Sequence, residues 1–119
     1  MKIDLIEKLD EIYKECSVEN WDGYSANPVS FDAIQEAKRF IQLLSNELPQ
    51  PNEILPEPDG AVGLVWYKSA NFIFVISFSG KKIIDYVGIF HGKKIKGTVS
   101  FEDDLIPQII KDIICSNFV

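Results

Sequence analysis

The chain is short of the residues that most metal and nucleic-acid sites need: it has one histidine, one arginine and two cysteines in 119 residues. Transition-metal sites usually require several His or Cys ligands, and His91 with the distant Cys16 and Cys115 is poor material for one. A single arginine, Arg39, also disfavours a nucleic-acid reader, because guanidinium groups supply much of the recognition of phosphate and guanine. We therefore expect no metal site, no cofactor and no nucleic-acid partner.

Long apolar runs are absent as well. The most apolar stretch, Phe72 to Phe78, is far shorter than the roughly 18 residues of a membrane helix. Residues 1 to 16 carry a charge every two or three positions, which is unlike an export signal. Two cysteines near opposite ends of the chain do not make the disulfide framework of a small secreted fold. We expect a cytoplasmic protein with no membrane partner and with both thiols reduced.

No standard catalytic or nucleotide motif is present: G-x-x-x-x-G-K-[ST], G-x-G-x-x-G, G-x-S-x-G and C-x-x-C are all missing. We therefore assign no catalytic residue. The net charge of −6 favours solubility and disfavours nonspecific binding to phosphate backbones. Residues 1 to 60 hold 13 acids and 5 bases, whereas residues 61 to 119 hold 5 acids and 7 bases. The acidic half would suit a basic partner.

Apolar residues at helical spacing predict three helices. The first covers Ile3 to Cys16. The second follows Ser30, a good N-cap residue, and should end before Pro49. The third covers Asp104 to Phe118, with Pro107 tolerated in its first turn.

Between the second and third helices, short apolar segments alternate with turns, which predicts strands and hairpins. Gly80 and Gly92 can supply positive φ in two of these turns. Glu53 to Leu55 could add a short edge strand. The predicted strands of the meander are Ala61–Tyr67, Phe72–Phe78, Ile83–Phe90 and Ile95–Phe101. The whole chain, residues 1 to 119, is thus predicted to be one two-layer α+β domain with a four-stranded antiparallel meander.

The strand Phe72 to Phe78 is apolar on both faces, since its phenylalanines share one face while Ile73 and Val75 occupy the other. Such a strand should be covered on both sides. Either all helices pack on one face and another subunit covers the second, or the helices divide between the two faces. The strand Ile95 to Phe101 alternates apolar and polar residues and should be an outer strand.

The loop Trp21-Asp22-Gly23-Tyr24-Ser25-Ala26-Asn27-Pro28 concentrates aromatic, acidic and turn-forming residues. Trp and Tyr are enriched at binding hot spots, so Trp21, Asp22 and Tyr24 are candidate binding residues. A structural interpretation competes with this one: Trp21 fills the core, Asp22 bonds local amides in an Asx turn and Gly23 provides backbone freedom.

The segment Pro56-Glu57-Pro58-Asp59-Gly60 contains two prolines followed by a turn acid and a glycine. We include Glu57 and Asp59 among the candidate binding residues, although the segment also suits a simple turn into the next strand. If both acids converged with Asp22, they could bind a hard cation. Convergence with His91 would instead favour a small hydrolase or metal-assisted enzyme, but His91 lies in a turn where solvent exposure is expected.

The combination of W-D-G-Y-S-A-N-P at 21 to 28 with P-E-P-D-G-A-V-G-L-V-W at 56 to 66 resembles a family of small bacterial proteins seen in mobile or phage-associated DNA. The resemblance covers about residues 20 to 102. It implies the domain boundaries and a bacterial or phage source, and it transfers no catalytic residue. Our leading hypothesis is a non-enzymatic protein-interaction module that binds a protein partner or itself, such as an antitoxin, immunity protein or defence accessory.

Overall fold

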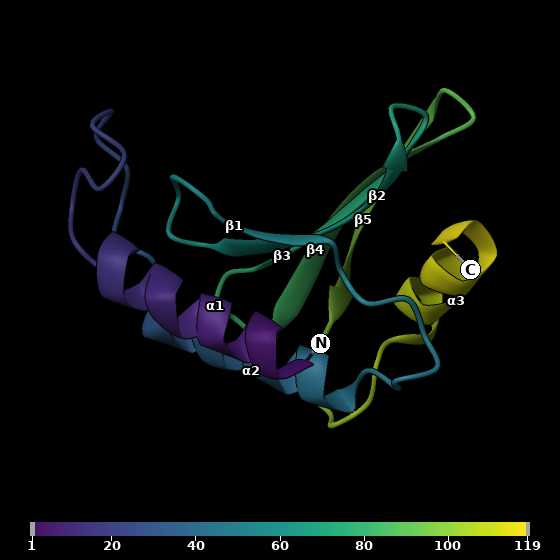
Figure 1. Cartoon of the computed structure of the whole chain (residues 1–119), viewed down its shortest axis with the longest axis horizontal. Helices are drawn as coiled ribbons and strands as arrows, with labels where there is room; N and C mark the ends of the chain where they lie inside the picture. Colours follow the sequence, from purple (N-terminus) through teal and green to yellow (C-terminus); the bar gives the residue numbers. More distant parts are fainter. Residues whose placement is uncertain (1, 119) are drawn as a thin grey trace.

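A computed structural model describes residues 2–118 of the chain as three helices and a five-stranded antiparallel sheet (Figure 1). The helices are α1 (Lys2–Cys16), α2 (Phe31–Leu43) and α3 (Gln108–Phe118), and the strands are β1 (Glu53–Pro56), β2 (Val62–Ser69), β3 (Phe72–Phe78), β4 (Ile83–Phe90) and β5 (Lys93–Ser100). The strand order β1-β2-β3-β4-β5 follows the chain, so each neighbouring pair is a hairpin. The predicted α+β class is confirmed, and the short edge strand makes the sheet five-stranded.

The second helix begins where its N-cap predicts and ends earlier than expected. The Ser30 side chain accepts a hydrogen bond from the amide of Ala33, which satisfies one of the free N–H groups of the first turn. The helix ends at Leu43, because Leu44 is already extended with ψ of 120°. Residues 44 to 49 therefore connect α2 to the sheet instead of lengthening the helix.

The third helix starts at Gln108, so the prediction that it begins at Asp104 is wrong. A proline disfavours the helical region for the residue before it, which here is Ile106. The chain can enter the helix only at Pro107, whose carbonyl accepts the first helical bond from the Lys111 amide at 3.1 Å.

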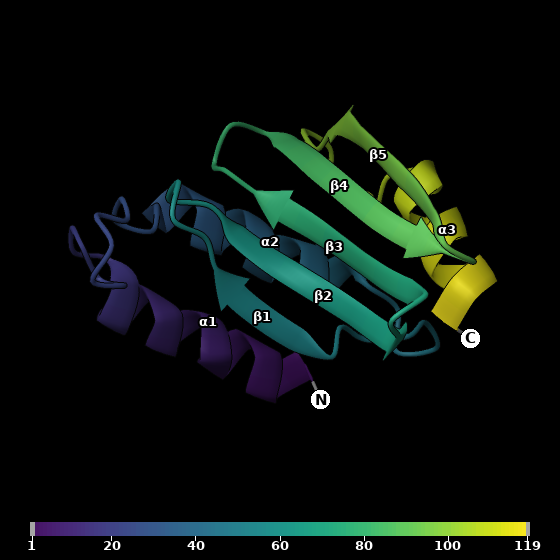
Figure 2. The same ribbon diagram turned by 90° about the horizontal axis from the view of Figure 1, so that it is seen from above.

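All three helices lie on one side of the sheet (Figures 1 and 2). Seen from above, α2 passes behind the central strands, α1 lies beside β1 and α3 lies at the far end of β4 and β5 (Figure 2). Phe40 of α2 is fully buried at the centre of this layer. Its ring centroid lies 6.3 Å from that of Trp66, 5.5 Å from Phe78 and 6.0 Å from Phe101. Aromatic contacts thus join α2 to the helical face of the sheet.

None of the described helices covers the second face of the sheet (Figure 2). Phe74 and Ile76 of β3 point into the core and are fully buried. Ile73 and Val75, on the other face of the same strand, stay partly exposed. The expectation that β3 is sheltered on both sides is therefore wrong for the single chain. Of the two arrangements that the sequence allowed, the structure adopts the one with all helices on one face.

Candidate interaction face

The uncovered side of the sheet is built from every second residue of its strands. Directly paired residues of antiparallel neighbours point to the same side, so the register arranges these side chains in rows across the sheet. The central row is Glu53, Val65, Val75, Val87 and Lys96. The row on one side is Leu55, Gly63, Ser77, Asp85 and Thr98, and the row on the other side is Tyr67, Ile73, Ile89 and Lys94. We call these residues the open face.

Apolar side chains of the open face come from strands β1 to β4, and among them Val65 in the central row is only 7% exposed. Tyr67 is 53% exposed and Leu55 is 42% exposed, while Ile73, Val87 and Ile89 are partly exposed. A contiguous apolar surface with polar residues around it marks an interaction site more often than scattered apolar residues do. The open face is therefore a candidate interaction surface.

One margin of the open face carries the carboxylate of Glu57, which comes from the β1–β2 turn. This side chain lies over Gly63, where an added Cβ would be 3.4 Å from Glu57 Oε1 and 3.5 Å from Val75 Cγ1. The missing side chain of Gly63 thus provides the space that the carboxylate occupies. Glu57 Oε1 is buried there without a hydrogen-bond partner.

Burial raises the pKa of Glu57, because the charged form loses solvation. The nearby hydroxyl of Ser77 lowers this pKa, and the nearby carboxylates of Asp59 and Asp85 raise it again. Asp85 itself accepts a hydrogen bond from the Thr98 hydroxyl at 2.6 Å. This margin of the open face is thus polar, and the Glu57 carboxylate in it is only partly solvated.

The tryptophan-bearing loop uses two of its three candidate binding residues to hold its own shape. Trp21 Nε1 donates to the carbonyl of Asn27 at 2.7 Å, and its ring packs partly buried against the core. Asp22 Oδ1 accepts from the amides of Tyr24 at 2.8 Å and Ala26 at 3.1 Å, which is the predicted Asx turn. Tyr24, by contrast, is 89% exposed and is free to contact a partner.

The loop and the proline-rich turn form one unit, which explains why the two motifs occur together. The Asn27 amide donates to the carbonyl of Pro58 at 2.8 Å, and the Ser30 amide donates to that of Gly60 at 2.9 Å. Gly60 has φ of 94°, and a Cβ at this position would lie 2.9 Å from the Pro28 carbonyl oxygen. Only glycine allows this close approach.

Of the candidate acids, Glu57 and Asp59 lie near each other, but the histidine is not brought to them. Asp59 Oδ1 accepts from the Ala61 amide, and no group of three His, Cys, Asp or Glu side chains within residues 2–118 is placed to hold a metal ion. His91 is exposed in the β4–β5 turn with its ring 4.7 Å from that of Phe72. It lies about 20 Å from Asp85 at roughly 3.3 Å per residue along the strand. A shared acid–base site for these residues therefore finds no support in the geometry.

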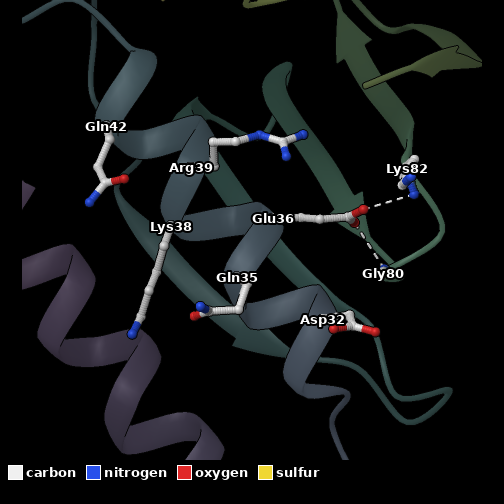
Figure 3. A pocket seen from close by; sticks show the side chains of 8 residues that line it. All are labelled: Asp32, Gln35, Glu36, Lys38, Arg39, Gln42, Gly80 and Lys82. Atoms are coloured by element: carbon white, nitrogen blue, oxygen red, sulfur yellow. Dashed lines mark hydrogen bonds between the residues drawn. The ribbon is translucent and has the colours of Figure 1, made fainter. Parts of the chain in front are cut away.

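A hollow lies on the outer surface of α2 beside the β3–β4 turn (Figure 3). Two of its charged side chains, Glu36 and Arg39, bond backbone groups of neighbouring segments. The Glu36 carboxylate accepts from the amides of Gly80 at 2.9 Å and Lys82 at 2.7 Å, as the dashed lines in Figure 3 show. Arg39 donates to the Phe101 carbonyl at 2.9 Å and lies over that ring. We interpret this hollow as the joint between α2 and the sheet.

Sequence reasoning missed most of the open face. Asp85 of β4 gave no local signal, because its role depends on which residues lie opposite it. The alternation of β5, with Lys94 and Lys96 on its polar side, was the one available clue.

No family model, no curated protein and no solved structure matches this chain. Within the part of the chain that the structure describes, no helix has the length and apolar character needed to span a membrane.

Proposed function

We propose that this chain is a non-enzymatic protein-interaction module that binds its partner through the open face. The observation that carries the proposal is the exposed apolar surface over β1 to β4, which the chain's own helices leave uncovered. Burying such a surface is favourable at about 25 cal/mol per Å² of apolar area.

The proline-rich turn at one end of the sheet extends this surface, and the tryptophan-bearing loop is hydrogen-bonded to that turn. Tyr24 is available at the tip of the loop, and Glu57 reaches from the turn onto the open face. Trp21 and Asp22 contribute by fixing the loop. An accessory, antitoxin or immunity role in a mobile element agrees with this arrangement, since such proteins act by binding another protein.

The test replaces the exposed apolar residues of the open face with serine. The double variant Leu55→Ser with Tyr67→Ser should keep the fold, because both residues are about half exposed and lie outside the core, and should lose the proteins that the wild type captures from bacterial lysate. The matched control is Leu105→Ser with Ile109→Ser, which removes exposed apolar groups of 73% and 44% exposure from the helical side.

Capture and oligomeric state are measured by pull-down and native mass spectrometry, with circular dichroism to verify folding. We expect the control to behave as the wild type does. Equal capture by the face variant and the wild type would overturn the proposal. So would a wild type that is monomeric and captures nothing.

A further inference from the structure

The central row of the open face carries opposite charges at its two ends. Glu53 stands on edge strand β1 and Lys96 on edge strand β5, with Val65, Val75 and Val87 between them. Both charged residues are exposed, and within residues 2–118 neither forms an ion pair. The row is therefore an acid, three valines and a base across the full width of the sheet.

This pattern matches itself when one copy is turned over. Consider a two-fold axis that lies midway between the two stacked sheets, above β3 and parallel to the strands. It places β1 of one copy opposite β5 of the other. Glu53 of each copy then faces Lys96 of the other, and Val75 faces its own equivalent. We propose that the partner of the open face is a second copy of this chain, stacked face to face about this axis, an inference that rests on the proposed function.

The charges select this axis over the alternative. A two-fold axis across the strands would place Glu53 opposite Glu53 and Lys96 opposite Lys96, which are repulsive pairs. Charged groups at an interface mainly set orientation and exclude wrong arrangements, while apolar burial supplies the affinity. Face-to-face sheets commonly pack with their strands within about 30° of each other; both axes give such an aligned arrangement, so the charges alone distinguish them.

Of the two outer rows, the one with Tyr67 and Ile89 favours this stacking, and the one with Gly63 and Asp85 disfavours it. The same axis places Tyr67 opposite Ile89 of the second copy, which extends the apolar contact. On the other row it places Asp85 opposite Gly63, over which the carboxylate of Glu57 lies. These two acids repel each other across the interface, so Glu57→Gln should strengthen association.

The size of the face sets the expected affinity. Five strands at about 4.8 Å span roughly 19 Å, and an eight-residue strand at about 3.3 Å per residue spans roughly 26 Å. Two stacked faces of this size bury on the order of 1,000 Å² in total, which is below the roughly 1,200 Å² of a standard interface. Such interfaces are weak, and we expect a dissociation constant on the order of tens of micromolar.

Sedimentation equilibrium from about 5 to about 500 µM protein brackets that affinity. Glu53→Lys and Lys96→Glu should each weaken the dimer roughly tenfold, because each turns two symmetry-related attractive pairs into repulsive ones. The variant with both substitutions should return to within about threefold of the wild type. The two single variants mixed together should associate more tightly than either does alone. In the mixture one copy has lysine at both ends of its central row and the other copy has glutamate at both ends, so every facing pair is attractive.

The matched controls make the same changes of charge away from the open face. Glu47→Lys in the α2–β1 connection and Lys111→Glu on α3 are exposed positions, and both should leave the dissociation constant unchanged. A wild type that stays monomeric at the highest concentration would overturn the proposal. Reversal variants that match the controls, or a double variant that fails to recover, would overturn it as well.

These experiments distinguish failure of self-association from failure of the proposed function. If the wild type is monomeric while the serine variant of Leu55 and Tyr67 still loses a captured protein, the open face binds a different partner. Association that responds to the charge reversals identifies the second copy as the occupant.

Discussion

Glu57 shows how one missing side chain shapes the open face. Gly63 leaves a space on the sheet, and the carboxylate from the neighbouring turn fills it. The acid is then half-buried beside two other carboxylates. A residue that the sequence suggested as a binding group is therefore also one that the folded chain holds at an energetic cost while it is ionised.

The raised pKa of Glu57 gives a prediction about stability and pH. The folded chain holds this proton more tightly than the unfolded chain, so the favourable contribution exists below the unfolded pKa and is lost as pH rises through the folded pKa. Glu57→Gln should therefore increase the free energy of unfolding at about pH 7 and change it less at about pH 3.5, where the acid is protonated in both states.

Urea denaturation at the two pH values measures this difference. Glu102→Gln removes an exposed carboxylate and serves as the control, with little effect at either pH. An equal gain for Glu57→Gln at both pH values would show that desolvation of the charge is not the cause.

Gly60 yields a second prediction at this scale. Gly60→Ala should destabilise the chain by about 2 kcal/mol or more, because a positive φ costs an L residue about 1–2 kcal/mol and the new Cβ also meets a backbone oxygen. Gly92→Ala is the matched control: Gly92 has φ of 77° but nothing within 4 Å of its would-be Cβ. Thermal unfolding should show a larger loss for Gly60→Ala than for Gly92→Ala. Equal losses would mean that the loop relaxes freely away from Pro28.

At the scale of elements, Glu36 fixes α2 to the sheet. Its two carboxylate oxygens accept one backbone amide each from the β3–β4 turn, and the side chain is 7% exposed. Hydrogen bonds to charged groups contribute about 1.5–3 kcal/mol each. Glu36→Ala should therefore lower the free energy of unfolding by about 3 kcal/mol, with Glu36→Gln intermediate because it keeps one carbonyl acceptor.

Chemical denaturation of both Glu36 variants, beside Gln35→Ala at the exposed neighbouring position, separates this bond from general helix effects. A loss for Glu36→Ala no larger than that for Gln35→Ala would contradict the assigned joint.

The sequence located best the elements that are bounded by clear turn residues. The strands β3 and β4 have the predicted bounds, since Gly80 and Gly92 end them and take the positive φ expected in their turns. Helix ends were harder to predict. Periodicity continued beyond Leu44 and began before Pro107, and only backbone geometry decided where each helix stops or starts.

At the scale of the whole molecule, the sequence indicated the layers but could not assign the faces. It identified β3 as apolar on both sides, yet one chain covers only one of them. The loop was recognised from its composition, whereas the open face depends on pairing between strands, such as that of Glu53 with Val65 and that of Val87 with Lys96. Local patterns carry no information on such register, which is set by the turns and the core together.

The placement of every helix beneath the sheet has a practical consequence for immobilising the protein. Helix α1 begins, and α3 ends, within the helical layer (Figure 1). A tether attached at either of these ends anchors the molecule with its strands directed away from the support. Sensor chips and affinity beads prepared in this way leave the sheet surface accessible to whatever flows past.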